Sequence, residues 1–220
     1  MNSHHSILTL AVASLFALAS STHAAEHAKA VSPAAAIANL QAGNKRFTTN
    51  PVTKGQPVAE RRKETAETQK PFAIIVGCAD SRTGPELVFD HNIGDLFVVR
   101  TAGNLVNEHA LGSIEYAVAH LGARLIVVLG HERCGAVKAA LGSATAPGNI
   151  NSIVRDIQPA VKAAKAKEGD ALTNTIHENV QQVAANIRAN AKLGELASEV
   201  RIVTAVYDLD TGVVEWPKEQ

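Results

Sequence analysis

Four short apolar runs, separated by stretches with helical character, constrain the fold of this chain most. The runs are residues 72–76, 96–99, 125–129 and 202–207, and they are rich in Ile, Val and Leu. Continuous apolar runs, rather than alternating ones, are typical of parallel strands that helices cover on both faces. The sequence therefore predicts an α/β fold with a mainly parallel β-sheet flanked by helices.

Helical patterns fill the chain between these runs, and a turn follows the last one. The expected helices cover residues 107–120, 134–141, 151–167 and 173–192. After the last run, residues 210–212 (Asp-Thr-Gly) predict a turn into a short final strand at 213–216. We therefore expect an antiparallel edge strand at the C-terminus.

The segment before the first run is polar and contains no strand pattern. Ala36 and Leu40 fall near one helical face, and a second helix is expected near residues 58–67. We expect an N-terminal helical arm over residues 25–70, ahead of a catalytic α/β domain over residues 71–220. An arm without a sheet of its own must pack on the main domain or on another subunit.

The first 24 residues resemble a secretory signal peptide. Their apolar run, residues 7–19, is shorter than the roughly 20 residues that span a bilayer but suits a signal sequence. Small residues at 22 and 24 fit cleavage after Ala24, which would leave a mature chain that begins at Ala25. We expect an exported protein, periplasmic or secreted, with no membrane span in the mature chain.

The charge balance argues against a nucleic-acid partner. Lys and Arg together number 21, as do Asp and Glu, and the isoelectric point is about 7.1. Such a chain has no strong overall field to attract phosphate backbones or anionic lipids. We therefore expect a small-molecule substrate and no nucleic-acid binding.

The chain has two cysteines, Cys78 and Cys134, and each lies in a loop directly after a predicted strand. In an exported protein, two cysteines commonly form one disulfide. The surrounding residues suggest another use, with Gly-Cys-Ala-Asp-Ser-Arg at 77–82 and Gly-His-Glu-Arg-Cys-Gly at 130–135. Because the carboxyl ends of parallel strands lie along one edge of a sheet, the two loops can converge on one site.

That convergence would bring Cys78, His131 and Cys134 together. Two thiolates and an imidazole form a ligand set that zinc favours, and three protein ligands are typical of catalytic zinc sites, which keep one position open. We therefore expect one Zn²⁺ per subunit. Asp80 is close enough in sequence to accept a hydrogen bond from metal-bound water, and Arg82 can pair with Asp80.

Together these motifs resemble the β class of the carbonic anhydrases. The resemblance covers residues 69–207 and rests on three motifs: Cys-Ala-Asp-Ser-Arg at 78–82, Arg-Thr-Ala-Gly-Asn at 100–104, and His-x-x-Cys-Gly at 131–135. It implies that the Cys, His and Cys of the first and third motifs bind zinc. It also implies that the Asp and Arg of the first motif form the family's catalytic dyad.

The resemblance further implies a substrate site and an oligomer. Gln69 matches a substrate-binding amide, and Phe97 and Tyr116 match apolar pocket positions that the family builds at a subunit interface. Gly135, directly after the last metal ligand, is assigned to the same substrate-binding set. Family members are dimers or larger, with the N-terminal arm embracing a neighbour, so a homodimer or homotetramer is expected.

The activity implied is the reversible hydration of carbon dioxide to bicarbonate and a proton by zinc-bound hydroxide. Zinc lowers the pKa of bound water from about 15.7 toward 7, which makes hydroxide available near neutral pH. Two alternatives stay open: a hydrolase of carbon disulfide or carbonyl sulfide at the same zinc, and a noncatalytic module with a Cys78–Cys134 disulfide. A disulfide would leave the pattern of His131, Asp80 and Arg82 without an explanation.

Some members of this family also have a closed state, in which the dyad aspartate becomes the fourth zinc ligand and bicarbonate stabilises that state at a noncatalytic site. Arg100 and Tyr207 match two residues of that site, whereas Ile75 stands where the family has tryptophan. We therefore expect an open site without bicarbonate inhibition of that type.

Overall fold

The structure, a computed structural model, describes residues 30–49 and 58–217. The expected signal peptide, residues 1–24, and its cleavage site after Ala24 lie outside these residues. Within the described ranges, no helix has both the length and the apolar character needed to cross a membrane.

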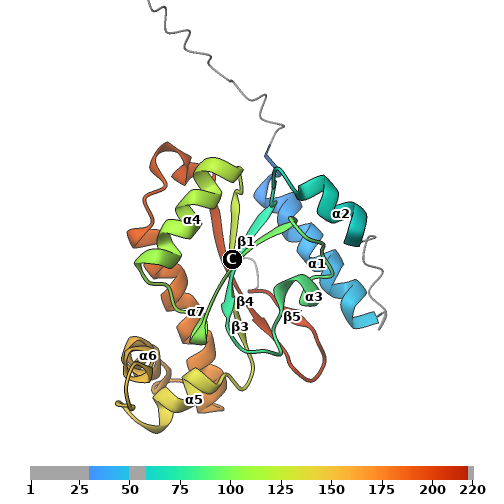
Figure 1. Cartoon of the computed structure of the whole chain (residues 1–220). Coiled ribbons are helices and arrows are strands. Elements are labelled where there is room, and N and C mark those ends of the chain that lie inside the picture. The colour runs from blue at the N-terminus through green and yellow to red at the C-terminus, as the bar shows by residue number, and fades with distance from the viewer. Residues whose placement is uncertain (1–29, 50–57, 218–220) are drawn as a thin grey trace, which may run out of the picture.

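A five-stranded sheet forms the centre of the fold (Figure 1). Its order is β2-β1-β3-β4-β5, with the first four strands parallel and β5 antiparallel to β4. The strands are β1 (Ala73–Cys78), β2 (Leu96–Thr101), β3 (Leu125–His131), β4 (Arg201–Tyr207) and β5 (Val214–Glu215). The predicted parallel sheet and its antiparallel C-terminal edge strand are confirmed.

Helices lie on both sides of this sheet (Figure 1). One side carries α4 (Glu108–Leu121), α5 (Gly135–Gly142), α6 (Ile150–Ala164) and α7 (Ala171–Asn190). The other side carries α1 (Pro33–Thr49) and α3 (Pro85–Val88), and α2 (Val58–Thr65) lies next to α1. The long helices begin and end within a few residues of the bounds that the sequence predicts.

Two apolar clusters, one on each face of the sheet, form the core. Ile74 and Ile126 pack in the first cluster with Ile114 of α4, whereas Ile75 and Val127 pack in the second. Successive side chains of a strand point to opposite faces, so a strand covered on both sides needs apolar residues at every position. This explains why the predicted strands read as continuous apolar runs.

The helix α1 packs on its own chain. Leu40 is fully buried in the second cluster. The side-chain amide of Asn44 donates hydrogen bonds to the carbonyl oxygens of Val88 and Gly212 and accepts one from the backbone N–H of Val214. Of the two possibilities that the sequence leaves open for this helix, the structure shows packing on the main domain.

Three short helical segments are not predicted by the sequence: α3 and the 3₁₀ helices η1 (Ala102–Asn104) and η2 (Gly194–Ser198). Segments of three to five residues are too short to show the helical period in a sequence. One of them matters for function, because η1 follows β2 and lies beside the end of β1.

Candidate metal centre

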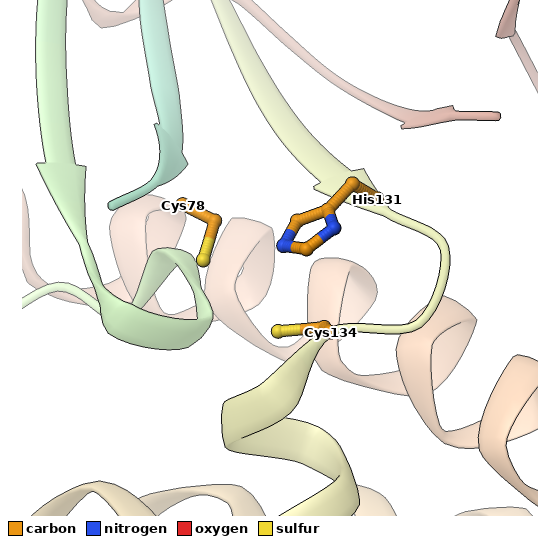
Figure 2. Close-up of side chains that lie close together, drawn as sticks. All are labelled: Cys78, His131 and Cys134. Atoms are coloured by element: carbon orange, nitrogen blue, oxygen red, sulfur yellow. The ribbon is translucent and has the colours of Figure 1, made fainter. Parts of the chain in front are cut away.

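Three potential metal ligands meet at the carboxyl edge of the sheet (Figure 2). Cys78 ends β1, His131 ends β3, and Cys134 directly precedes α5. Their sulfur and nitrogen ligand atoms all lie within 4.8 Å of one another. The three residues are buried, with exposed fractions of 5%, 1% and 2%. Because β1 and β3 are parallel neighbours, their loops converge as the sequence predicts.

The imidazole of His131 is oriented as a metal ligand. Its Nδ1 lies 2.8 Å from the backbone carbonyl oxygen of Glu132, so Nδ1 carries the proton and donates it to that oxygen. The lone pair is therefore on Nε2, which is buried and has no hydrogen-bond partner among the described residues. A buried polar atom without a partner is unfavourable, and a metal ion would satisfy this one.

Both cysteines are free thiols. The hydrogen bond from Cys134 outweighs burial and lowers the pKa of the Cys78 thiol to about 4, while the bond to Cys78 and burial raise the pKa of Cys134. Thiolates bind metals, so this pair, together with one imidazole nitrogen, fits Zn²⁺ with a fourth position left open. The structure does not show the disulfide of the noncatalytic alternative.

Asp80 and Arg82 form a bidentate ion pair beside this cluster. Nε of Arg82 donates to Oδ1 of Asp80 at 2.9 Å, Nη2 donates to Oδ2 at 2.7 Å, and the backbone N–H of Arg82 donates to Oδ1 at 3.0 Å. These hydrogen bonds hold the pKa of Asp80 well below its usual range. Oδ2 lies 3.9 Å from Nε2 of His131. An anionic acceptor is therefore held at the edge of the cluster.

Arg100 supports the loop that carries Asp80. Its Nε donates to the carbonyl oxygen of Cys78 at 2.7 Å, and its Nη2 donates to the carbonyl oxygen of Asp80 at 2.6 Å. The hydroxyl of Thr83 donates to the same Asp80 oxygen at 3.0 Å. The sequence marked Arg100 as part of the 100–104 motif and of the bicarbonate site that the resemblance implies, and neither predicts this contact with the loop that carries Asp80.

A second support for Cys78 comes from η1 and α7. The backbone N–H of Gly103 donates to Sγ of Cys78 at 3.3 Å, and the buried amide of Asn179 donates to the carbonyl oxygen of Gly103 at 2.9 Å. Gly103 has a φ of 70°, in the left-handed region that favours glycine. Gly103 lies in the 100–104 motif, whereas no pattern in the sequence marks Asn179.

The structure does not bring the whole predicted substrate site together within one chain. Gly135 directly follows the last ligand at the start of α5. Gln69 is exposed in the loop before β1, at the opposite end of that strand from Cys78. Phe97 is partly buried near the amino end of β2, and Tyr116 is 50% exposed on α4.

Comparisons with known proteins identify the family of this chain. The family model described as carbonic anhydrase matches residues 73–214. The chain is 40% identical to a carbonic anhydrase of Mycolicibacterium smegmatis over 196 residues, which is 83% of this chain and 92% of that protein. It is also 40% identical to carbonic anhydrase 2 of Mycobacterium tuberculosis over 189 residues, 82% of this chain and 90% of that protein.

A solved structure shares both the fold and part of the sequence. It is the Coccomyxa β-carbonic anhydrase in complex with acetazolamide, with a TM-score of 0.65 and 29% identity, covering 82% of this chain and 83% of that one. The family model spans the sheet, and the relatives are matched over nearly their full length. The shared fold supports the same family. The chain belongs to the β class of the carbonic anhydrase family of enzymes.

Proposed function

We propose that this enzyme catalyses the zinc-dependent, reversible hydration of carbon dioxide to bicarbonate and a proton. Membership of the carbonic anhydrase family supports the reaction. The metal assignment depends on one observation above all: Nε2 of His131 is buried, unpartnered among the described residues, and close to two free thiols.

In this proposal, Cys78, His131 and Cys134 hold one Zn²⁺ per subunit. When bound, the ion acts as a Lewis acid that lowers the pKa of a water ligand from about 15.7 toward 7. The side chains of the protein would orient the attacking oxygen. Asp80 is anionic, and both of its oxygens are held by Arg82, so it is a fixed acceptor for the proton of the attacking oxygen. That hydrogen bond turns a lone pair of the oxygen toward the carbon of the substrate.

Gln69, Phe97, Tyr116 and Gly135 are the proposed substrate contacts. A Cβ at Gly135 would meet no atom within 4 Å in the described part of the chain, so there is open space next to Cys134. The amide of Gln69 would hold an oxygen of carbon dioxide or bicarbonate. Phe97 and Tyr116 would provide an apolar surface, which suits a nonpolar gas.

The positions of these contacts favour a homo-oligomer. Gln69 lies at the far end of β1 from the cluster of its own chain, and half of the Tyr116 surface is exposed. Residues placed in this way can serve the site of a neighbouring subunit. We therefore include a homodimer, or a homotetramer built from dimers, in the proposed function.

The proposal also places the enzyme outside the cytoplasm. The apolar run at residues 7–19 and the small residues before Ala25 support export and cleavage after Ala24. N-terminal sequencing of the protein recovered from the export compartment tests this directly. A chain that begins at Met1 would contradict it.

The central test compares the mature wild-type enzyme with His131→Asn. His109→Asn is the matched control, because His109 is exposed on α4. We expect about one zinc per chain and rapid carbon dioxide hydration, measured by stopped flow, in the wild type and the control. We expect neither in His131→Asn. Equal zinc content and equal rates in all three proteins would contradict the proposal.

The same preparations distinguish the sulfur-compound hydrolase. Carbonyl sulfide and carbon disulfide are offered in place of carbon dioxide, and released sulfide is measured. We expect hydration of carbon dioxide to be much the faster reaction. Sulfide release with a higher kcat/KM would favour the alternative.

A further inference from the structure

The loop that carries two of the metal ligands is tied to a distant turn. Nη1 and Nη2 of Arg133 donate to the two carboxylate oxygens of Asp210, at 2.7 and 2.8 Å. Asp210 lies in the turn between β4 and β5, 77 residues further along the chain. Arg133 itself lies between His131 and Cys134, so the ion pair acts on the segment that sets the spacing of these ligands.

The neighbouring residue Glu132 contacts the same turn. Its backbone N–H donates to the carbonyl oxygen of Tyr207 at 2.9 Å, and its Oε2 accepts a hydrogen bond from the backbone N–H of Leu209 at 3.3 Å. Both residues that separate His131 from Cys134 are therefore attached to the segment that follows β4.

The backbone at Arg133 needs such support. Its φ is 51°, in the left-handed region that residues with a Cβ rarely adopt. This left-handed residue lies directly before Cys134, in the loop that joins the end of β3 to the start of α5. An unfavourable conformation persists when the surrounding contacts hold it in place, and here the Asp210 carboxylate does so.

The exposure of this ion pair indicates whether it affects global stability or the metal centre. The side chains of Arg133 and Asp210 are 50% and 71% exposed. Exposed ion pairs contribute little to global stability, although a bidentate geometry still restricts the groups that it joins. Groups that orient metal ligands typically change metal affinity by roughly 10 to 100-fold. The pair is thus placed to affect the metal centre more than the fold.

We infer that Arg133 and Asp210 form a clamp that positions His131 and Cys134 for metal binding. Both are positioning residues, because they act through the ligand loop. The inference deepens the proposed function and rests on it, since the clamp serves the same metal centre.

The test uses the mature chain and variants chosen to separate backbone from side chain. Arg133→Gly accepts the left-handed backbone without strain but removes the ion pair. Asp210→Asn keeps the shape of the side chain and removes its charge, and Arg133→Lys keeps a charge without the bidentate geometry. Asp156→Asn is the control, because Asp156 also belongs to an exposed ion pair, with Arg155 at 3.0 Å.

The zinc dissociation constant is measured by competition with a chromophoric chelator, and the Co²⁺-loaded proteins give thiolate-to-metal absorption bands. We expect Arg133→Gly and Asp210→Asn each to raise the dissociation constant by about 10-fold and to shift these bands. The double variant should have the same zinc dissociation constant as either single variant, because both substitutions remove the same ion pair. The zinc dissociation constant of Arg133→Lys should lie between those of the single variants and that of the wild type. Asp156→Asn should match the wild type.

Urea unfolding of the zinc-free proteins provides the second measurement. The clamp predicts unchanged midpoints, whereas a purely structural role would lower the midpoints and leave the zinc affinity unchanged. Wild-type zinc affinity in both Arg133→Gly and Asp210→Asn, or additive losses in the double variant, would overturn the clamp alone. Failure of the wild type and the Asp156→Asn control to bind zinc would overturn the proposed function as well.

Discussion

Oδ2 of Asp80 lies 3.9 Å from Nε2 of His131, yet the same oxygen accepts a 2.7 Å hydrogen bond from Arg82. Since Arg82 binds both carboxylate oxygens, Asp80 lies at the edge of the three candidate metal ligands and is paired with Arg82. An open site requires this pairing of Asp80 with Arg82, and the expectation of an open site stays a prediction. The expected lack of bicarbonate inhibition stays a prediction, and cooperative loss of activity with added bicarbonate at mildly acidic pH would contradict it.

Removing Arg82 should damage catalysis without removing the metal. In Arg82→Ala the Asp80 carboxylate loses both side-chain hydrogen bonds and keeps the one from the backbone N–H, so its orientation is no longer fixed. We expect kcat/KM for carbon dioxide hydration to fall roughly 10 to 100-fold, with zinc content unchanged. Arg155→Ala, which removes an exposed ion pair elsewhere, should retain wild-type activity. Stopped-flow assays and metal analysis check this, and equal rates in both variants would refute it.

Metal removal should lower the stability of the whole domain. The three ligands come from the ends of β1 and β3 and from the start of α5, so a bound ion links elements that are distant in sequence. Free Zn²⁺ at about 100 times its dissociation constant should raise the free energy of unfolding by about 2.7 kcal/mol over the chelated protein. Urea unfolding measures the shift. Cys78→Ser should greatly reduce it, and a full shift in that variant would place the metal elsewhere.

The stability contributed by Asp95 should depend on pH. Asp95 accepts a 2.7 Å hydrogen bond from Arg61 of α2, a helix that buries none of its residues. Burial raises the pKa of Asp95, but the nearby His91 imidazole (Nδ1 3.6 Å from Oδ2), the hydrogen bond from the backbone N–H of Asn92 and the charge of Arg61 outweigh burial and lower it. A carboxyl group with a lowered pKa stabilises the fold above its unfolded-state pKa, about 3.9, and this contribution is lost as the pH falls through the folded-state value.

Asp95→Asn should therefore lower the free energy of unfolding by roughly 1 kcal/mol at pH 7. The difference from the wild type should shrink as the pH falls below about 4. Urea titrations of both proteins at several pH values measure this. A difference that stays constant with pH would show that the charge of Asp95 has no part in anchoring α2.

Two glycine substitutions should have opposite effects on stability. A Cβ at Gly43 in α1 would lie 1.7 Å from the backbone carbonyl oxygen of Phe89, whereas a Cβ at Gly112 in α4 would meet nothing within 4 Å in the described structure. We expect Gly112→Ala to stabilise the protein by roughly 0.5–1 kcal/mol through helix propensity. Gly43→Ala should destabilise it by about 3 kcal/mol, because α1 must move away from α3. Similar urea midpoints for both variants would show that α1 does not dock in this way.

Much of the fold could be predicted because its causes are local. Strands covered on both faces must be apolar at every position, so the runs around Ile75 and Val127 mark parallel strands without reference to the rest of the chain. Parallel strands place their carboxyl ends on one edge, which predicts that Cys78 and His131 meet. The pairing of Asp80 with Arg82 is also local, because the two residues are two positions apart.

Other contacts were decided only by tertiary structure. Arg133 meets Asp210 across 77 residues, and Asn179 reaches Gly103 across 76, so no spacing or period in the sequence connects them. The sequence likewise did not show where α1 packs, and the structure places its buried face against the sheet of its own chain. The sequence alone therefore determined the parallel strands, the carboxyl edge of the sheet and the three candidate ligands that meet there, because these follow from local chemistry. How the ligand loops are held depends on side chains that only folding brings within hydrogen-bond distance.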